Sequence, residues 1–159
     1  MKPLFGLLFI FLLASCSIGD DSGDNLPTET EAEAYTRNQE EIEAFLEANE
    51  LTAETTESGL HYIITEEGTG EMPTATSTVL VNYEGFLLNG SVFDKTTTRP
   101  AQFNLAKLIP GFKEGMTYVK EGGKAMLLIP ARLAYGPYRA GDIPPYSVII
   151  FEVELVEIL

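Results

Sequence analysis

From Leu60 onward, apolar and polar residues alternate with a period of two, and this pattern limits the fold more than any other feature of the sequence. Successive side chains in a strand point to opposite faces of a sheet, so the alternation predicts strands that are buried on one face. The apolar sets are Leu60, Tyr62 and Ile64, then Val79, Val81 and Tyr83, then Ala125, Leu127 and Ile129, and finally Phe151, Val153 and Leu155. Glu152 and Glu154 occupy the opposite face of the last strand, which we therefore expect to contact water.

Two local signals indicate how these strands are connected. Asn89-Gly90 lies between two apolar runs, and an Asn-Gly pair in that position is a strong signal for a tight hairpin. A short helix is predicted from Pro110 to about Val119, because proline is favoured in the first turn and Ile109, Phe112 and Met116 recur on one side. An antiparallel, twisted sheet wrapped on one short helix is an α+β fold, and we expect it to occupy residues 51–159.

A second helix is predicted upstream of this domain, in residues 34–50. Tyr35, Ile42, Phe45 and Leu46 recur near helical spacing among many glutamates, which is typical of an amphipathic helix. The apolar stripe of this helix needs a partner, either the following domain or the same helix in a second copy of the chain. The sequence does not choose between them, so a homodimer through residues 34–49 stays open.

The first residues indicate export. Lys2 precedes an apolar run from Pro3 to Ala14, and the polar residues from Ser17 onward follow it directly. The run is well short of the roughly 20 apolar residues that a membrane span needs. We therefore interpret residues 1–15 as a signal peptide.

Cys16 follows Leu13-Ala14-Ser15, and this segment resembles the lipobox of bacterial lipoproteins. The resemblance implies cleavage before Cys16, lipidation of its sulfur, and anchoring in the bacterial cell envelope, at the outer membrane facing either the periplasm or the outside. Two or more acyl chains hold a protein stably on a bilayer. The alternative is an ordinary secretory signal followed by a chance cysteine. Residues 16–33 contain few apolar side chains to bury, so we predict a disordered acidic tether.

Composition excludes several classes of function. The formal net charge of -14 and the isoelectric point near 4.3 argue against nucleic acid, because phosphate binding needs clustered Lys and Arg. Cys16 and His61 are the only Cys and His in the sequence, which argues against metal sites built from these side chains. We predict no metal and no cofactor. His61 falls on the polar face of its predicted strand, so we expect it to be exposed.

Three segments carry a resemblance to a known family. They are VNYEGFLLNGSVFD (residues 81–94), LIPGFKEGM (108–116) and AYGPYRAGDIPPYSVIIFEVEL (134–155), and they resemble segments of FKBP-type peptidyl-prolyl cis-trans isomerases in order and spacing. In that family the segments form a strand-hairpin-strand, the start of a single helix, and a long loop with the last strand. Each segment alone is weak evidence, but the three in order are specific.

The resemblance implies a pocket and assigns residues to it. Its catalytic positions are Tyr83, Phe93, Asp94, Ile109, Tyr135 and Phe151, and its substrate-binding positions are Leu108, Phe112 and Ile143. It implies that Phe112 forms the floor, where the family often has tryptophan, and that the Ile109 amide and the Tyr135 hydroxyl donate hydrogen bonds to substrate carbonyls. Ala101 departs from the family, which usually has a second pocket phenylalanine there, and the nearby Phe103 could replace it in part.

The function that the resemblance implies is cis/trans isomerisation of X-Pro bonds in exported polypeptides by a membrane-tethered folding assistant. Its partners are proline-containing unfolded chains. The reaction needs no nucleophile, because rotation about the amide only has to overcome its resonance. An alternative from a different class keeps the fold and drops catalysis: a chaperone or partner-binding module that uses the same apolar cleft. The departure at Ala101 keeps this alternative open.

Overall fold

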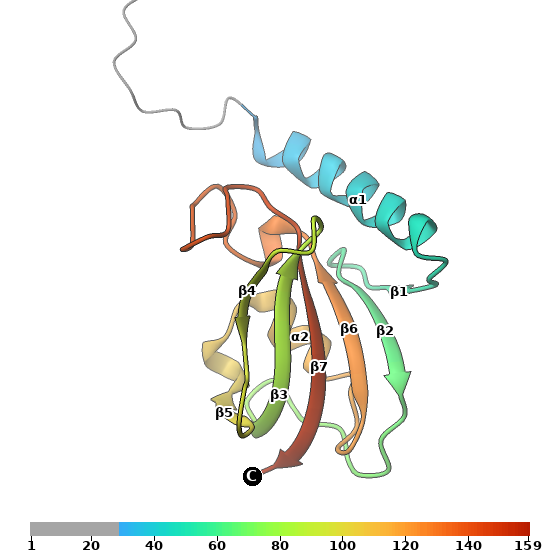
Figure 1. The fold of residues 1–159 in the computed structure, drawn as a ribbon, viewed down its shortest axis with the longest axis vertical. Coiled ribbons are helices and arrows are strands. Elements are labelled where there is room, and N and C mark those ends of the chain that lie inside the picture. The colour runs from blue at the N-terminus through green and yellow to red at the C-terminus, as the bar shows by residue number, and fades with distance from the viewer. Residues whose placement is uncertain (1–28) are drawn as a thin grey trace, which may run out of the picture.

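The computed structural model describes residues 29–159, and Figure 1 shows their fold. The predicted signal peptide, Cys16 and most of the predicted tether lie outside the described residues. The helices of the described part are α1 (Glu31–Ala48) and α2 (Pro110–Met116), with short 3-10 turns at Leu105–Lys107 and Ala131–Leu133. The strands are β1 (Glu54–Thr55), β2 (His61–Glu66), β3 (Thr78–Leu87), β4 (Val92–Lys95), β5 (Ala101–Asn104), β6 (Lys124–Ile129) and β7 (Ile149–Ile158).

The strands form one antiparallel sheet in the order β1-β2-β6-β7-β3-β4, and β5 also pairs with β3. The long strands β3 and β7 lie side by side, paired from Val79 with Ile158 to Leu87 with Ile149. The predicted hairpin joins β3 to β4. In it the Gly90 amide donates to the Leu87 carbonyl at 2.8 Å, and Gly90 has a φ of 83°, which glycine adopts without strain.

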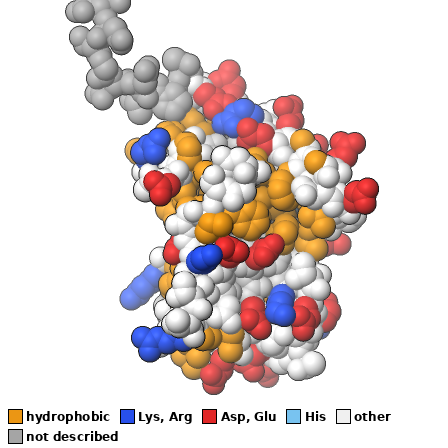
Figure 2. Space-filling model, viewed as in Figure 1, with side chains coloured by type: hydrophobic (Ala, Val, Ile, Leu, Met, Phe, Trp, Pro, Cys, Tyr) orange, Lys and Arg blue, Asp and Glu red, His pale blue; other side chains and the backbone are white. Residues whose placement is uncertain are grey.

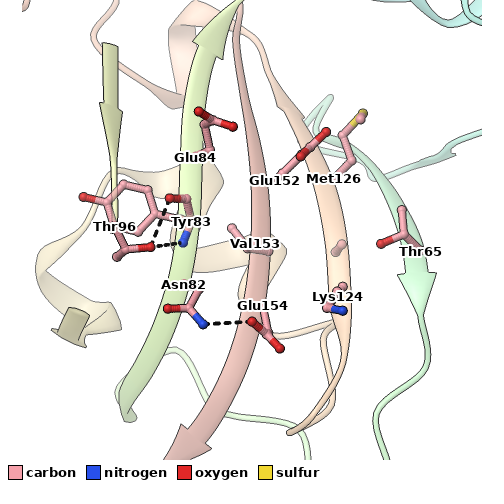
Figure 3. A pocket seen from close by; sticks show the side chains of 11 residues that line it. Thr65, Asn82, Tyr83, Glu84, Thr96, Lys124, Met126, Glu152, Val153 and Glu154 are labelled. Carbon is pink, nitrogen blue, oxygen red and sulfur yellow. Dashed lines mark hydrogen bonds between the residues drawn. The ribbon is translucent and has the colours of Figure 1, made fainter. Parts of the chain in front are cut away.

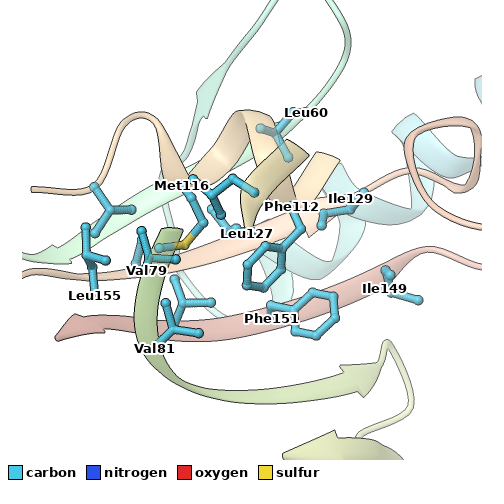
Figure 4. Packing of buried hydrophobic residues seen from close by; sticks show 14 of the residues in the cluster. Leu60, Val79, Val81, Phe112, Met116, Leu127, Ile129, Ile149, Phe151 and Leu155 are labelled. Atoms are coloured by element: carbon cyan, nitrogen blue, oxygen red, sulfur yellow. The ribbon is translucent and has the colours of Figure 1, made fainter. Parts of the chain in front are cut away.

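The inner face of the sheet curves around α2, and the main hydrophobic core lies between them. Figure 4 shows side chains of α2 packed against those of β3, β6 and β7. The inner residues of the alternating sets are buried, as in Val79 and Leu127, which are 0% exposed. α2 ends at Met116, earlier than the predicted Val119, although Val119 is still buried in the same core. The predicted α+β fold is confirmed.

α1 begins at Glu31, before the expected start at residue 34, because Thr30 and Glu33 form a capping box. The Thr30 side-chain oxygen accepts from the Glu33 amide at 3.3 Å, and the Glu33 carboxylate accepts from the Thr30 amide at 2.9 Å. These bonds satisfy backbone N–H groups that have no partner inside the helix. The apolar pattern carries no trace of this cap. Neither α1 nor α2 has the length and apolarity needed to cross a membrane.

α1 covers one end of the outer face of the sheet (Figure 1). Ile42 is fully buried there against Leu128, Val148 and Ile150. Of the two glutamates predicted to contact water on the outer face of β7, Glu152 is exposed and Glu154 is half-buried, while Ile150 on the same face is buried beneath α1. The apolar stripe of α1 is partnered in this structure by the following domain of the same chain.

His61 is buried, which contradicts its predicted exposure. Its side chain is 5% exposed, with Nε2 2.8 Å from the Gln39 Oε1 of α1 and Nδ1 3.1 Å from the Thr55 Oγ1 of β1. The polar face of β2 is dry at this position because α1 lies next to it. Burial lowers the pKa of His61, and the negative charge of Glu43 opposes this shift.

Candidate functional site

A small cavity opens between the inner face of the sheet, the start of α2 and the segment after β6. It is lined by Tyr83, Asp94, Phe103, Leu108, Ile109, Phe112, Tyr135 and Phe151. Its volume is about 190 Å³. Pockets for drug-sized ligands usually occupy about 300–1,000 Å³. The cavity therefore accommodates a group the size of one side chain rather than a large ligand.

Aromatic rings in edge-to-face contact build the floor of this cavity. Phe112 and Phe151 are 4% and 7% exposed, and their ring centroids are 5.1 Å apart with an angle of 87° between the rings. Tyr83 also meets the Phe151 ring edge-on, at 6.0 Å. This arrangement places the positive edge of one ring against the negative face of the next and stabilises the group beyond its burial. The floor is therefore rigid and apolar.

Gly85 makes room for these rings, and the sequence interpretation missed it. A Cβ at this position would lie 2.6 Å from the Phe93 ring and 2.7 Å from the Phe151 ring, closer than any real contact. The signal was present in the alternation, because Gly85 follows Tyr83 by two residues and so shares its inner face. A glycine in a strand interior often marks a close approach of this kind.

Tyr83 fixes the carboxylate at the edge of the cavity. Its hydroxyl donates to Asp94 Oδ2 at 2.7 Å. Burial and the hydrogen bond to Asp94 together raise the pKa of Tyr83 to about 12, with burial as the larger cause. The phenol therefore stays protonated over the physiological range and holds Asp94 in one position. This arrangement suits a carboxylate that maintains pocket shape rather than one that transfers protons.

Two candidate donors border the cavity. Ile109 is the N-cap residue of α2, with extended backbone (φ -56°, ψ 146°), and its amide makes no backbone hydrogen bond within residues 29–159. Tyr135 lies in the segment after the second 3-10 turn, and its side chain is 37% exposed. An amide and a phenol at the rim are suitable donors for carbonyl oxygens of an extended peptide.

The structure places two of the predicted positions behind the cavity rather than in its lining. Phe93 packs edge-on against Phe151, with centroids 5.5 Å apart, and supports the floor from the side. Ile143 is 4% exposed and belongs to the main core, because its loop turns it inward. Phe103 does line the cavity, as expected of a partial replacement at Ala101. The other predicted positions lie together: Tyr83, Asp94, Leu108, Ile109, Phe112, Tyr135 and Phe151.

A larger hollow of about 460 Å³ lies on the outer face of the sheet (Figure 3). Two of its polar side chains are engaged in pairs: Asn82 donates to Glu154 at 2.8 Å, and Lys124 donates to the neighbouring Glu66 at 2.7 Å. On the face of the molecule that Figure 2 shows, apolar side chains gather next to α1, and charged side chains lie on the far side of them from α1. Residues 29–159 contain no group of three or more His, Cys, Asp or Glu side chains arranged to hold a metal ion. The aromatic cavity on the inner face is therefore the better candidate site.

Comparison with known proteins places this cavity in a family. Residues 69–156 match the model of the FKBP-type peptidyl-prolyl cis-trans isomerases. The FKBP-type peptidyl-prolyl cis-trans isomerase FkpA of Escherichia coli strain K12 is 44% identical over 113 residues, which cover 70% of this chain and 42% of that protein. The chain spans about half the length of the curated relatives it matches.

Solved structures agree with this match. The crystal structure of FkpA from Escherichia coli has a TM-score of 0.71 and 40% identity, over 80% of this chain and 60% of that chain. A peptidyl-prolyl cis-trans isomerase from Pseudomonas syringae has a TM-score of 0.69 and 30% identity, over 86% of this chain and 98% of that chain. Sequence, fold and the aromatic cavity thus lead to one conclusion: the chain belongs to the FKBP-type peptidyl-prolyl cis-trans isomerase family.

Proposed function

We propose that this protein catalyses the cis/trans isomerisation of X-Pro bonds in exported polypeptides. One observation carries the proposal: Phe112, Phe151 and Tyr83 converge on a mainly apolar cavity of side-chain size with hydrogen-bond donors at its rim. The cavity suits the ring of a proline. Its lining comes from segments that match the isomerase family, and relatives are named for this activity.

The apolar floor lowers the rotation barrier by excluding water. Rotation about an X-Pro bond faces a barrier of about 20 kcal/mol, because the planar amide is stabilised by resonance. The planar amide is also the more charge-separated state, so transfer into an apolar site disfavours it relative to the twisted state. Phe112 and Phe151 supply that environment. Proline enters with its ring against them, and the peptide carbonyls stay at the rim.

The donors at the rim add selectivity for the twisted state. The Ile109 amide and the Tyr135 hydroxyl donate to carbonyls of the bound peptide, and Asp94, held by Tyr83, keeps the edge of the cavity in place. Donors that fit the twisted geometry better than the planar one accelerate the reaction. A thousandfold acceleration requires about 4 kcal/mol, which a few such interactions can supply.

A peptide assay tests this function. The purified chain, with Cys16→Ser to remove lipidation, is added to a short X-Pro peptide, and exchange spectroscopy measures the rate of cis/trans conversion. We expect clear acceleration by the protein and a lower rate with Tyr135→Phe, which removes only the hydroxyl at the rim. Conversion at the uncatalysed rate would contradict the proposed catalysis and favour the alternative, a non-catalytic binding module that uses the same cleft.

We also propose that the protein acts from a lipid anchor in the bacterial cell envelope. The support is the lipobox-like segment that ends at Cys16, together with the acidic residues that separate it in sequence from the start of α1 at Glu31. Detergent-phase partitioning of the protein from cells tests the anchor. We expect the wild type in the detergent phase and Cys16→Ser in the aqueous phase, and equal partitioning of the two contradicts the anchor.

Association of two copies through residues 34–49 stays a prediction. Ala34, Asn38 and Ile42 are buried against their own chain, so a dimer would use side chains of α1 that remain exposed. Sedimentation equilibrium of the purified protein measures the mass directly. A monomeric mass at high concentration rules the dimer out.

A further inference from the structure

α1 binds both ends of the loop that carries Tyr135. This loop, residues 130–148, joins β6 to β7. The Ala131 amide at its beginning donates to Asn38 Oδ1 at 2.9 Å. Asn38 Nδ2 in turn donates to the Tyr146 carbonyl near the loop's end at 3.1 Å. One side chain therefore clamps two backbone positions that lie fifteen residues apart in the sequence.

Asn38 is an unusual residue for its position. It lies between Ala34 and Ile42 on the buried stripe of α1, and all three are at most 2% exposed. A polar side chain in such a place destabilises the fold unless its hydrogen bonds are satisfied. Here the oxygen of the amide is satisfied by the loop, its Nδ2 donates to the Tyr146 carbonyl and also to Glu41 Oε2 at 3.1 Å, and Ala34 packs against Ala131 and Tyr146 beside it. Two of the three hydrogen bonds of this buried side chain therefore go to the loop.

The clamped positions are bonded directly to the neighbour of Tyr135. The Gly136 amide donates to the Ala131 carbonyl at 2.8 Å, and the Tyr146 amide donates to the Gly136 carbonyl at 2.8 Å. Tyr146 has a φ of 54°, a left-handed conformation that is unfavourable for a residue with a side chain. Its persistence requires support from surrounding contacts. Asn38 supplies that support, and Arg37 adds a second donor to the Tyr146 carbonyl at 3.2 Å.

We propose that Asn38 is a positioning residue for the isomerase site, acting through the loop 130–148 on Tyr135. Asn38 does not touch the cavity. Its two hydrogen bonds hold Ala131 and Tyr146, these hold Gly136, and Gly136 sets the direction in which Tyr135 presents its hydroxyl. α1 thereby contributes to the site although none of its residues lines the cavity. The inference rests on the proposed function for its effect on rate.

The experiment compares two truncations on the same face of α1. Asn38→Ala removes the clamp, and Ile42→Ala, one turn later, removes packing against Leu128, Ile150 and the last loop residue Val148 but leaves both hydrogen bonds of the clamp in place. Both are measured in the full chain at a temperature where urea titration shows them folded. We expect Asn38→Ala to lower kcat/KM about fivefold, mainly through kcat, because small misplacements of a donor cost rate. Ile42→Ala should change kcat/KM less than about twofold. Equal losses in the two variants overturn the proposal.

A second readout does not depend on activity. Amide hydrogen exchange at Gly136 and Tyr146 should become at least about tenfold faster in Asn38→Ala and stay near wild type in Ile42→Ala, because only the first variant loosens the loop. Unchanged exchange in Asn38→Ala contradicts the clamp. If the wild type itself lacks isomerase activity, the proposed function fails while the exchange data still decide the clamp. If Asn38→Ala does not fold, Asn38→Ser, whose shorter side chain keeps a polar group but cannot reach both loop positions, is expected to speed exchange at Gly136 and Tyr146, and no change at either overturns the clamp.

Discussion

Helices α1 and α2 cover opposite faces of the same sheet, and they differ in what makes them helical. α2 has 7 residues, no side-chain cap, and buries Gly111, Phe112, Gly115 and Met116. A helix this short is not stable alone in water, so packing against the sheet forms it. α1 has 18 residues and a complete capping box, yet buries only Ala34, Asn38 and Ile42. The helical conformation of α1 therefore depends more on its length and its N-terminal cap than on burial, in contrast to α2.

The two helices therefore have different relations to the cavity: α2 supplies part of its floor, whereas α1 contacts the loop that carries Tyr135. The floor of the cavity belongs to the element that cannot exist without the core, so the floor is as stable as the whole domain. α1 can be loosened by smaller perturbations, because fewer of its side chains are buried and its contacts reach the cavity only through the loop that Asn38 holds. Perturbations of α2 should therefore unfold the domain, whereas those of α1 should change local behaviour first.

The largest expected effect is on the α2 side. Phe112→Ala removes a buried ring that packs against Phe151, and such truncations cost about 3–5 kcal/mol. We expect the unfolding free energy from urea titration to fall by this amount in one cooperative transition, and the isomerase rate to fall at least about tenfold where the protein is still folded. A loss of unfolding free energy no larger than that caused by Thr30→Ala in α1 contradicts the contrast between the helices.

Tyr83→Phe is expected to have a smaller effect on stability, also on the inner face of the sheet. The variant loses the hydrogen bond to Asp94, and we expect a loss of about 1 kcal/mol. The pKa of Tyr83 is raised to about 12, so the folded state keeps a proton that the unfolded state releases near pH 10. Stability from this group is therefore complete below pH 10 and is lost as the pH rises toward 12. Ultraviolet titration should show one tyrosine near pH 12 in the wild type and none in the variant. Tyr138→Phe, at a side chain 72% exposed, is the control and should leave that late titration unchanged.

The sequence predicted the inner side of the molecule better than the outer side, for a physical reason. Period-two alternation is local, so it reported the strands, the Asn89-Gly90 hairpin and the inner faces directly. The cavity positions came from the family resemblance, and the structure brings most of them together. The contacts of α1 are not local: Asn38 reaches Ala131 and Tyr146 from far along the chain. No periodicity records such pairs, which is why His61 was expected to be exposed.

Thr30→Ala tests whether α1 depends on its own end. The variant removes the cap, and cap losses cost about 0.5–2 kcal/mol, with the smaller values expected for an exposed cap such as this. We expect faster amide exchange in the first turns of α1 and unchanged exchange in α2. Thr36→Ala is the matched control, since Thr36 lies on the exposed side of the same helix and bonds only the Ala32 carbonyl. If exchange in α2 also accelerates in Thr30→Ala, the two helices are not independent.

The smallest expected effect is a weakening of the α1 contact in acid. Burial lowers the pKa of His61, so the unfolded state takes up a proton, near its usual pKa of about 6.5, before the folded state does. Stability from the neutral side chain is therefore complete above pH 6.5 and falls as the pH drops below it. Glu43 opposes the shift, which keeps the effect small, and Gln39 and Thr55 can still accept hydrogen bonds from a protonated ring. Unfolding free energies at pH 7.5 and pH 5.5 should differ more for the wild type than for His61→Gln, because carboxylates contribute equally to both. Identical pH dependence in the two proteins would mean that protonation of His61 does not weaken the contact between α1 and the sheet. Acid would then destabilise the α1 side of the sheet no more than the α2 side.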